Sequence, residues 1–143
     1  MTSLLVGIDG SESCRRAVAF ACRLADESGA VLHIVHVIPW SPYSFTSPAE
    51  NEHRSASKAQ EIAAAEEQIM KPALAVADAY RINPTSIVVH GSPADQLVAI
   101  GARQAASQII VGRTGDSRLK QVLFGSTPVR LIQMSKTPVT VVP

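Results

Sequence analysis

The chain lacks the features that mark secreted, membrane-spanning and nucleic-acid-binding proteins. The first ten residues, MTSLLVGIDG, contain no basic region followed by a long apolar segment, so they do not resemble a secretory signal. No apolar run approaches the ~18 residues that a membrane-spanning helix needs. The 13 basic and 12 acidic residues leave a net charge of +1, which gives no electrostatic reason for a nucleic-acid partner. We therefore expect a soluble cytoplasmic protein whose partners are neither nucleic acids nor membranes.

Cysteines are few, and no metal-ligand cluster is visible. Cys14 and Cys22 are the two cysteines, and on one helix they would lie about 12 Å apart, too far for a disulfide. We expect both to pack as small apolar residues. The four histidines form no group at zinc-ligand spacing, and His33 and His36 should point to opposite faces of a strand. We interpret the histidines as structural or surface residues and expect no metal site of protein ligands alone.

The signatures of several common enzymes are absent as well. The chain has no G-x4-G-K-[ST] loop and no G-x-G-x-x-G fingerprint, so the lysine-assisted ATPase site and the usual NAD site are missing. It also has no G-x-S-x-G turn, which carries the nucleophile of many hydrolases. We predict no catalytic residue from these patterns.

What the sequence does contain is an alternation of apolar runs and helical periods. The apolar fraction of 46% in 143 residues suits one domain with one core, residues 1–143. Strands are predicted at 3–8, 30–38, 85–91, 108–112 and 138–142, and helices at 12–28, about 52–80, 92–107 and 126–135. This alternation predicts an α/β fold, with one parallel sheet covered by helices on both faces.

Glycine and proline set the expected boundaries. Gly29 should end the first helix in a left-handed conformation, and Pro72 should kink or restart the long second one, because proline has no N–H for the helical hydrogen bond. Ser92 is a plausible N-cap. The segment 39–51, rich in proline and serine, is predicted as a loop. The aromatic residues within 39–48 could form a lid or a partner contact, or simply pack.

Two stretches lie at predicted carboxyl ends of strands, where ligands bind in open α/β sheets. The sequence from Gly112 to Thr127 contains three glycines and ends on Ser126 and Thr127. Such a loop leading into a helix can bind phosphate through backbone N–H groups, or it can be a flexible loop with an ordinary serine cap. Asp9 follows the first strand, where its carboxylate could bond a ribose hydroxyl or a phosphate-bound metal, or the backbone N–H groups of its own turn.

These stretches resemble the universal stress protein family. Gly112-x2-Gly115-x9-Gly125-Ser126 matches the family motif G-x2-G-x9-G-[ST], and VGIDGSE, VHV, GSPADQLV, QIIVGRTG and TPVTVV resemble family segments in the expected order. The resemblance covers the whole chain. It implies a Rossmann-like, adenine nucleotide alpha hydrolase-like three-layer sandwich with strand order 3-2-1-4-5, usually a homodimer, from the ATP-binding branch.

The resemblance also implies a set of binding residues. Those for the base and ribose are Gly7, Ile8, Asp9, Val37, Val111 and Gly112, and those for the phosphates are Arg113, Gly115, Gly125, Ser126 and Thr127. Thr114 stands where the family often has histidine. Mg²⁺ or Mn²⁺ could accompany the phosphates. The last strand would be an apolar edge that pairs with a second copy across a two-fold axis, unless local loops cover it.

The leading interpretation is a cytoplasmic regulatory protein that binds ATP. Without a placed base or catalytic lysine, its site should hydrolyse ATP slowly or not at all. The alternative is a dimeric interaction module of the same fold that is nucleotide-free or binds another adenine nucleotide. A third class, enzymes of the pyrophosphatase type, usually carries an S-G-G-x-D-S-like loop, which GIDGSES lacks.

Overall fold

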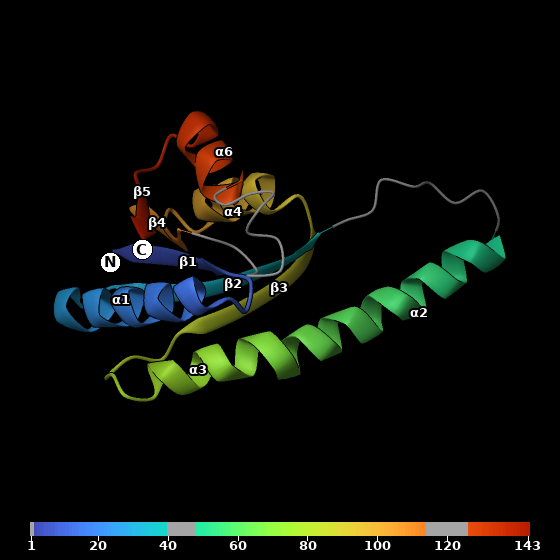
Figure 1. The fold of residues 1–143 in the computed structure, drawn as a ribbon, viewed down its shortest axis with the longest axis horizontal. Helices are drawn as coiled ribbons and strands as arrows, with labels where there is room; N and C mark the ends of the chain where they lie inside the picture. Colours follow the sequence, from blue (N-terminus) through green and yellow to red (C-terminus); the bar gives the residue numbers. More distant parts are fainter. Residues whose placement is uncertain (1, 40–47, 114–125) are drawn as a thin grey trace.

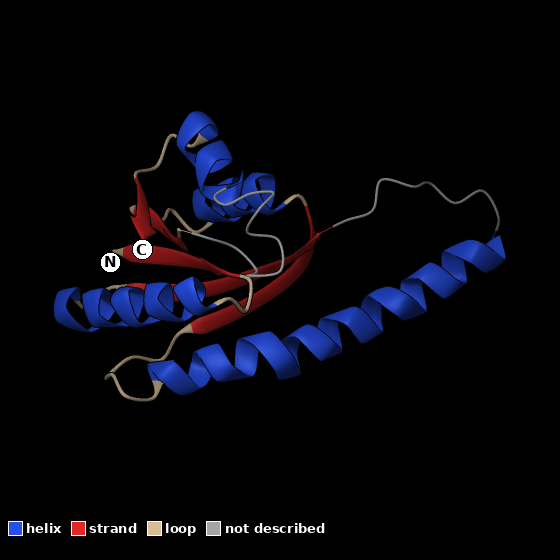
Figure 2. Cartoon of the chain, viewed as in Figure 1, coloured by secondary structure: helices blue, strands red, loops and turns tan. Residues whose placement is uncertain are grey.

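The structure is a computed structural model that describes residues 2–39, 48–113 and 126–143, with the backbone alone for 48–55 and 126. The strands are β1 (Ser3–Ile8), β2 (Val31–Pro39), β3 (Thr85–Gly91), β4 (Gln108–Gly112) and β5 (Val139–Val142). The helices are α1 (Glu12–Ser28), α2 (Pro48–Ala65), a π-helical turn η1 (Glu66–Met70), α3 (Lys71–Ala77), α4 (Pro93–Arg103) and α6 (Ser126–Met134). Strands and helices alternate as predicted (Figure 2).

The strands form one parallel sheet in the order β3-β2-β1-β4-β5, which confirms the expected topology. Helices α1 and α3 cover one face, and α4 and α6 cover the other (Figure 1). A strand buried on both faces reads as a continuous apolar run. This explains why β1, all of whose residues are buried, could be located from the sequence.

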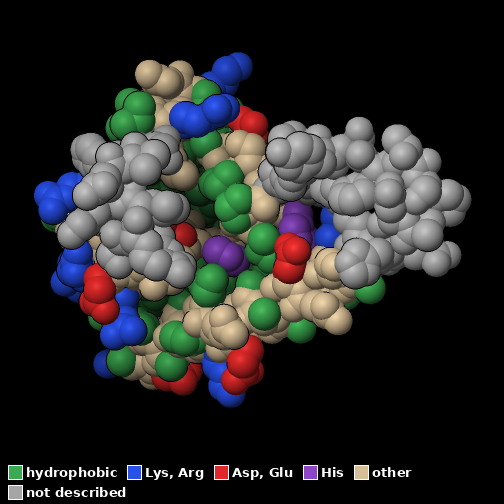
Figure 3. Space-filling view, turned by 45° about the vertical axis from the view of Figure 1, so that its right-hand side comes forward, with side chains coloured by type: hydrophobic (Ala, Val, Ile, Leu, Met, Phe, Trp, Pro, Cys, Tyr) green, Lys and Arg blue, Asp and Glu red, His purple; other side chains and the backbone are tan. Residues whose placement is uncertain are grey.

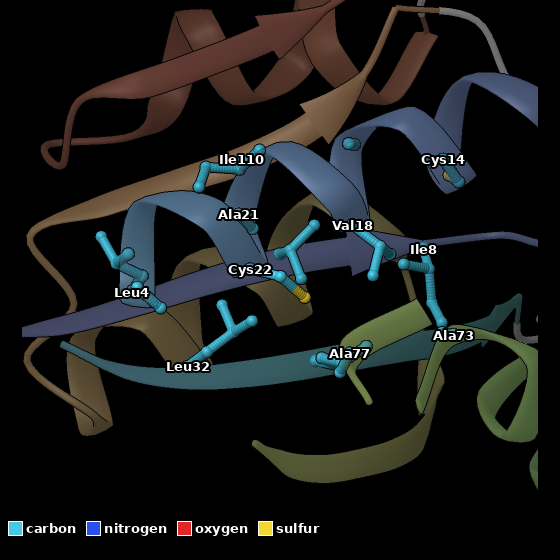
Figure 4. Close-up of a cluster of buried hydrophobic side chains, with 14 of the residues drawn as sticks. Leu4, Ile8, Cys14, Val18, Ala21, Cys22, Leu32, Ala73, Ala77 and Ile110 are labelled. Atoms are coloured by element: carbon cyan, nitrogen blue, oxygen red, sulfur yellow. The ribbon is translucent and has the colours of Figure 1, made fainter. Parts of the chain in front are cut away.

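Helix α1 is amphipathic and lies against β1, β2 and β4. Its N-cap is Ser11, and Gly29 ends it with a φ of 72°, so both predicted ends are confirmed. Figure 4 shows Val18, Ala21 and Cys22 of α1 pointing toward the sheet. Both cysteines are buried and free, which confirms that they pack in the core.

The second helical stretch differs from the prediction at its start and agrees near Pro72. Residues 48–51, expected in a loop, already belong to α2; Pro48 stands at the first helical position, where its missing N–H is no loss. Just before Pro72 the helix passes through the π-helical turn η1, in which the N–H of Lys71 donates to the carbonyl of Glu66. Helix α3 then continues (Figure 1), so the expected restart is present.

Two contacts attach this long helix to the sheet. Nε2 of His90, on β3, lies 2.8 Å from Oε2 of Glu61 on α2. Met70, at the end of η1, is buried in the core beneath α1. The π-helical turn therefore sits against the body of the fold rather than in the exposed part of α2.

Helix α4 begins after Ser92, whose φ of −82° and ψ of 123° are those of an N-cap residue. Its carbonyl accepts from the N–H of Gln96, but its side chain makes no capping hydrogen bond, which corrects the sequence prediction in part. The helix ends at Arg103, four residues before the predicted end at 107, because Ala105 adopts a left-handed φ of 52°. No helix in the described ranges is long and apolar enough to cross a membrane.

Candidate functional site

The order in which the strands are added to the sheet reverses between β1 and β4. From β1 the chain passes to α1 on one face, and after β4 it forms α6 on the opposite face before it enters β5. Connections that leave neighbouring strands on opposite faces open a crevice beyond the carboxyl ends of those strands. Gly7 and Val111 are paired across this boundary. In the space-filling view of Figure 3, which is rotated by 45° from that of Figure 1, hydrophobic and histidine side chains lie in the middle of the visible face.

Asp9 stands at the carboxyl end of β1 and opens the turn into α1. Its Oδ1 accepts the N–H of Ser11 at 2.9 Å and the thiol of Cys14, whose Sγ lies 2.9 Å away. Gly10 completes the turn with a φ of +85°, and the nearest side-chain atom to its missing Cβ is Cγ1 of Ile69, at 3.5 Å. The turn-bonding role that the sequence allowed for Asp9 is therefore present, while the residue as a whole remains exposed.

Cys14 is the buried member of this turn, with 6% of its surface exposed. Burial, followed by the charge of Asp9 and the hydrogen bond to it, raises the pKa of the Cys14 thiol to about 12. The thiol is therefore protonated at neutral pH and has a hydrogen to donate. Sequence reasoning treated Cys14 only as a small apolar residue and missed this contact.

Gly112 ends β4 and lies directly against the first turn of α1. A Cβ at this position would be 2.5 Å from Oγ of Ser13, 2.8 Å from its carbonyl carbon and 2.9 Å from the amide nitrogen of Cys14. Glycine at 112 thus has a packing requirement that needs no ligand. Together with the Asp9 turn, this contact joins the ends of β1 and β4 through α1.

Four further predicted residues lie around the same strand ends. Val37 near the end of β2 and Val111 in β4 are buried on the face covered by α4 and α6, whereas Ile8 is buried on the α1 face. At Gly7, a Cβ would lie 2.8 Å from Cδ1 of Leu97, on α4. Gly7, Ile8, Val111 and Gly112 are therefore brought together, and Val37 lies one strand away on the other side of β1.

Of the predicted phosphate-binding residues, the structure describes Arg113, Ser126 and Thr127. Arg113 is exposed, and its N–H donates to the carbonyl of Val142 at 2.7 Å. Gly115, Gly125 and Thr114 lie outside the described residues. Ser126 begins α6 and Thr127 is half-buried in its first turn. Because α6 returns between the parallel strands β4 and β5, its N-terminus lies toward the carboxyl edge of the sheet.

The two histidines of β2 form hydrogen bonds with the two strands that flank it, β3 and β1. Nδ1 of His33 lies 2.6 Å from Oγ1 of Thr85 on β3, and Nδ1 of His36 donates to the carbonyl of Ile8 on β1 at 2.7 Å. Within the described ranges, no group of three or more histidine, cysteine or carboxylate side chains is placed to bind a metal ion.

This topology is that of a Rossmann-like α/β protein, a fold in which ligands generally bind at the carboxyl ends of the strands. The family model for the universal stress protein family matches residues 1–143. The chain belongs to the universal stress protein family.

Individual relatives agree with this assignment. Universal stress protein YxiE of Bacillus subtilis is 29% identical over 152 residues, covering 97% of each chain. The solved universal stress protein UspA from Lactobacillus plantarum superposes with a TM-score of 0.81 at 23% identity, covering 99% of this chain and 97% of its own. A universal stress protein solved in complex with cAMP is 29% identical, with a TM-score of 0.66 and coverage of 99% and 96%.

Proposed function

We propose that this protein binds an adenine nucleotide, ATP in the first instance, across the carboxyl ends of β1 and β4. The base and ribose would lie against Gly7, Ile8, Asp9, Val37, Val111 and Gly112, and the phosphates against Arg113, Gly115, Gly125, Ser126 and Thr127. In this proposal the protein is a cytoplasmic regulatory protein of the stress response, and nucleotide binding is its signal.

One observation carries the proposal: the exposed carboxylate of Asp9 is fixed at the switch point of the sheet, beside the end of β4. Oδ1 is occupied by two donors of its own turn, and in the described part of the chain no donor reaches Oδ2. A fixed carboxylate oxygen at this edge suits a ribose hydroxyl, which donates a hydrogen bond. The relative in complex with cAMP supports an adenine nucleotide as the ligand.

Binding without significant turnover follows from the chemistry of the same residues. Phosphoryl transfer requires a placed base or water-positioning group and a cation at the transferred phosphate. At the phosphates the proposed site offers backbone N–H groups, hydroxyls and Arg113, which bind phosphate but are not bases, and the carboxylate of Asp9 is assigned to the ribose instead. Mg²⁺ or Mn²⁺ would come with the phosphates rather than with a cluster of protein ligands.

The direct test is calorimetry of the purified protein with ATP, ADP, AMP and cAMP, alongside mass spectrometry of small molecules released on denaturation. We expect binding of at least one adenine nucleotide and its loss in Gly125→Val, because a side chain blocks the approach of the backbone to phosphate. Gly29→Ala, at the far end of α1, is the control that should lower stability and leave affinity unchanged. Absence of binding by the wild-type protein would refute the proposal, and ATP turnover well above ~1 per second would refute its non-catalytic part.

A second candidate function is that of a dimeric interaction module. Strand β5 is an edge of the sheet, and on the neighbouring helix α6 the residues Val129 and Ile132 are 50% and 62% exposed. An apolar edge next to exposed apolar side chains favours pairing with a second copy by two-fold symmetry. Sedimentation at micromolar concentration should show a dimer, and Ile132→Glu should weaken it. A wild-type monomer would contradict this candidate.

A further inference from the structure

The turn between β1 and α1 contains an uncommon hydrogen-bond arrangement centred on a sulfur atom. The thiol of Cys14 donates to Oδ1 of Asp9, with Sγ and Oδ1 2.9 Å apart. In return, the backbone N–H of Asp9 donates to the same Sγ at 3.2 Å. The two residues are thus joined by two hydrogen bonds of opposite sense, one through the side chain of Asp9 and one through its backbone.

The position of Cys14 in α1 explains how this contact arises. Ser11 is the N-cap and its Oγ accepts the N–H of Cys14, so Cys14 is the third residue of the helix. In a capping box the side chain at this position reaches back to the N–H of the N-cap residue. Here Oδ1 of Asp9 already accepts the N–H of Ser11, and the side chain of Cys14 reaches Asp9 instead.

The protonation of the thiol fits this role. Burial beside a carboxylate keeps the pKa of Cys14 far above neutral pH, so the sulfur carries its hydrogen whenever the protein is in ordinary solution. The same environment makes Cys14 a poor nucleophile, because the thiolate is the reactive form. Its role is therefore that of a hydrogen-bond donor, and Oδ1 of Asp9, at 2.9 Å, is a nearer acceptor than the carbonyl of Gly7, at 3.9 Å.

The consequence concerns the second oxygen of Asp9. Two donors, the Ser11 amide and the Cys14 thiol, converge on Oδ1 and fix the rotation of the carboxylate. Among the described residues nothing donates to Oδ2, the oxygen that the proposal assigns to the ligand. A carboxylate held by one oxygen presents the other in a single direction, and this lowers the ordering cost of binding a ligand hydroxyl.

We propose that Cys14 is a positioning residue for nucleotide binding: it orients Asp9 so that Oδ2 accepts a ribose hydroxyl. This inference rests on the proposed function and adds to it the group that sets ribose recognition. It predicts that removal of the thiol weakens ribose-dependent binding through Asp9, while the rest of the nucleotide site is unchanged.

A first experiment examines the hydrogen bond without any nucleotide. In Cys22→Ala, Cys14 is the remaining thiol of the chain, and its S–H stretching band can be recorded by infrared spectroscopy. We expect a band shifted to lower frequency than that of the unfolded protein, and a return toward the unfolded value in Cys22→Ala/Asp9→Ala, which removes the acceptor. A band at the unfolded position in the folded Cys22→Ala protein would overturn the inference.

A second experiment measures nucleotide affinity by calorimetry in Cys14→Ala, Cys14→Ser and Cys22→Ala. Loss of one hydrogen bond that orients a carboxylate should weaken binding by about fivefold in Cys14→Ala. Cys14→Ser keeps a donor and should restore most of the affinity. Cys22→Ala, which removes a buried thiol of the same helix away from Asp9, is the matched control and should bind as the wild type does.

The decisive comparison is a double-mutant cycle with Asp9→Ala. If Cys14 acts through Asp9, Cys14→Ala should weaken binding in the wild-type background and have little further effect in Asp9→Ala. An additive effect, or wild-type affinity in Cys14→Ala, would overturn the inference and leave the proposed function intact. Failure of the wild-type protein to bind any adenine nucleotide would refute the proposed function, and this inference with it.

Discussion

Substitution of Gly112 by alanine should destabilise the protein in the absence of any ligand. The new Cβ would lie 2.8 Å from the carbonyl carbon of Ser13 and 2.9 Å from the amide nitrogen of Cys14. Both are backbone atoms of a helix whose inner face is buried against the sheet, so they cannot turn aside as a side chain can. Either α1 or the end of β4 must move.

The expected cost is near the top of the range for overpacked cores, about 3 kcal/mol. Two other glycines calibrate this number. Gly29→Ala meets no atom within 4 Å but must adopt a φ of 72°, which costs about 1–2 kcal/mol. Gly101→Ala meets the terminal carbon of Ile109 at 3.3 Å, and the gain of up to about 1 kcal/mol in helix propensity offsets much of that crowding.

Urea unfolding followed by circular dichroism gives the three free energies of unfolding on one scale. The order of loss should be Gly112→Ala, then Gly29→Ala, then Gly101→Ala, with unchanged m-values. A Gly112→Ala protein as stable as Gly29→Ala would show that α1 moves away at little cost, and would refute the argument that backbone contact with α1 requires glycine at this position.

Three further predictions concern the core and the titratable groups. Leu131→Ala should cost about 2–5 kcal/mol, because this leucine of α6 is fully buried. Gln133→Ala, at an exposed position of the same helix, should change stability by less than about 0.5 kcal/mol; thermal and urea unfolding would separate them. Burial raises the pKa of Cys14 to about 12 and that of Cys22 to about 11 from 9.0, so the folded state keeps protons that the unfolded state loses, and stability should fall as the pH rises above about 9. Each thiol should contribute a loss of about 1 kcal/mol between about pH 9 and about pH 10, and equal slopes for wild type and Cys22→Ala would contradict this. Burial lowers the pKa of His33 below 6.5, so the unfolded state binds the proton first, and stability should fall as the pH drops below about 6.5; a His33→Asn variant should lose less over that range, and parallel curves would refute the assignment.

Most of the fold could be predicted from the sequence because buried strands and an amphipathic helix leave direct patterns. The bounds of β3 and β4 match the predicted 85–91 and 108–112, and α1 runs from Glu12 to Ser28 as expected. The misses are local. Helix α2 begins at Pro48, and proline suits a loop as well as the first helical position. Helix α4 ends before Ala105, whose left-handed φ is not indicated by a glycine or asparagine in the sequence.

The candidate site was predictable only in outline. The alternation of strands and helices indicates that ligands bind at the carboxyl ends of strands, and so points to Asp9 and Gly112. It does not indicate that Gly112 lies against Ser13, because that contact joins residues about a hundred positions apart in the sequence. The hydrogen bond from Cys14 to Asp9 is local, but a cysteine near a helix start is more often simply a buried apolar residue.

The first turn of α1 connects the two halves of the proposed site. Its Ser13 and Cys14 approach Gly112 at the end of β4, and Cys14 bonds Asp9 at the end of β1. A single helical turn therefore determines both the spacing of these strand ends and the direction of the Asp9 carboxylate. A side chain at 112 that displaces α1 would also displace Cys14 from Asp9. In the proposed site, Gly112 would therefore influence the ribose end through α1, independently of any contact of its own with a nucleotide.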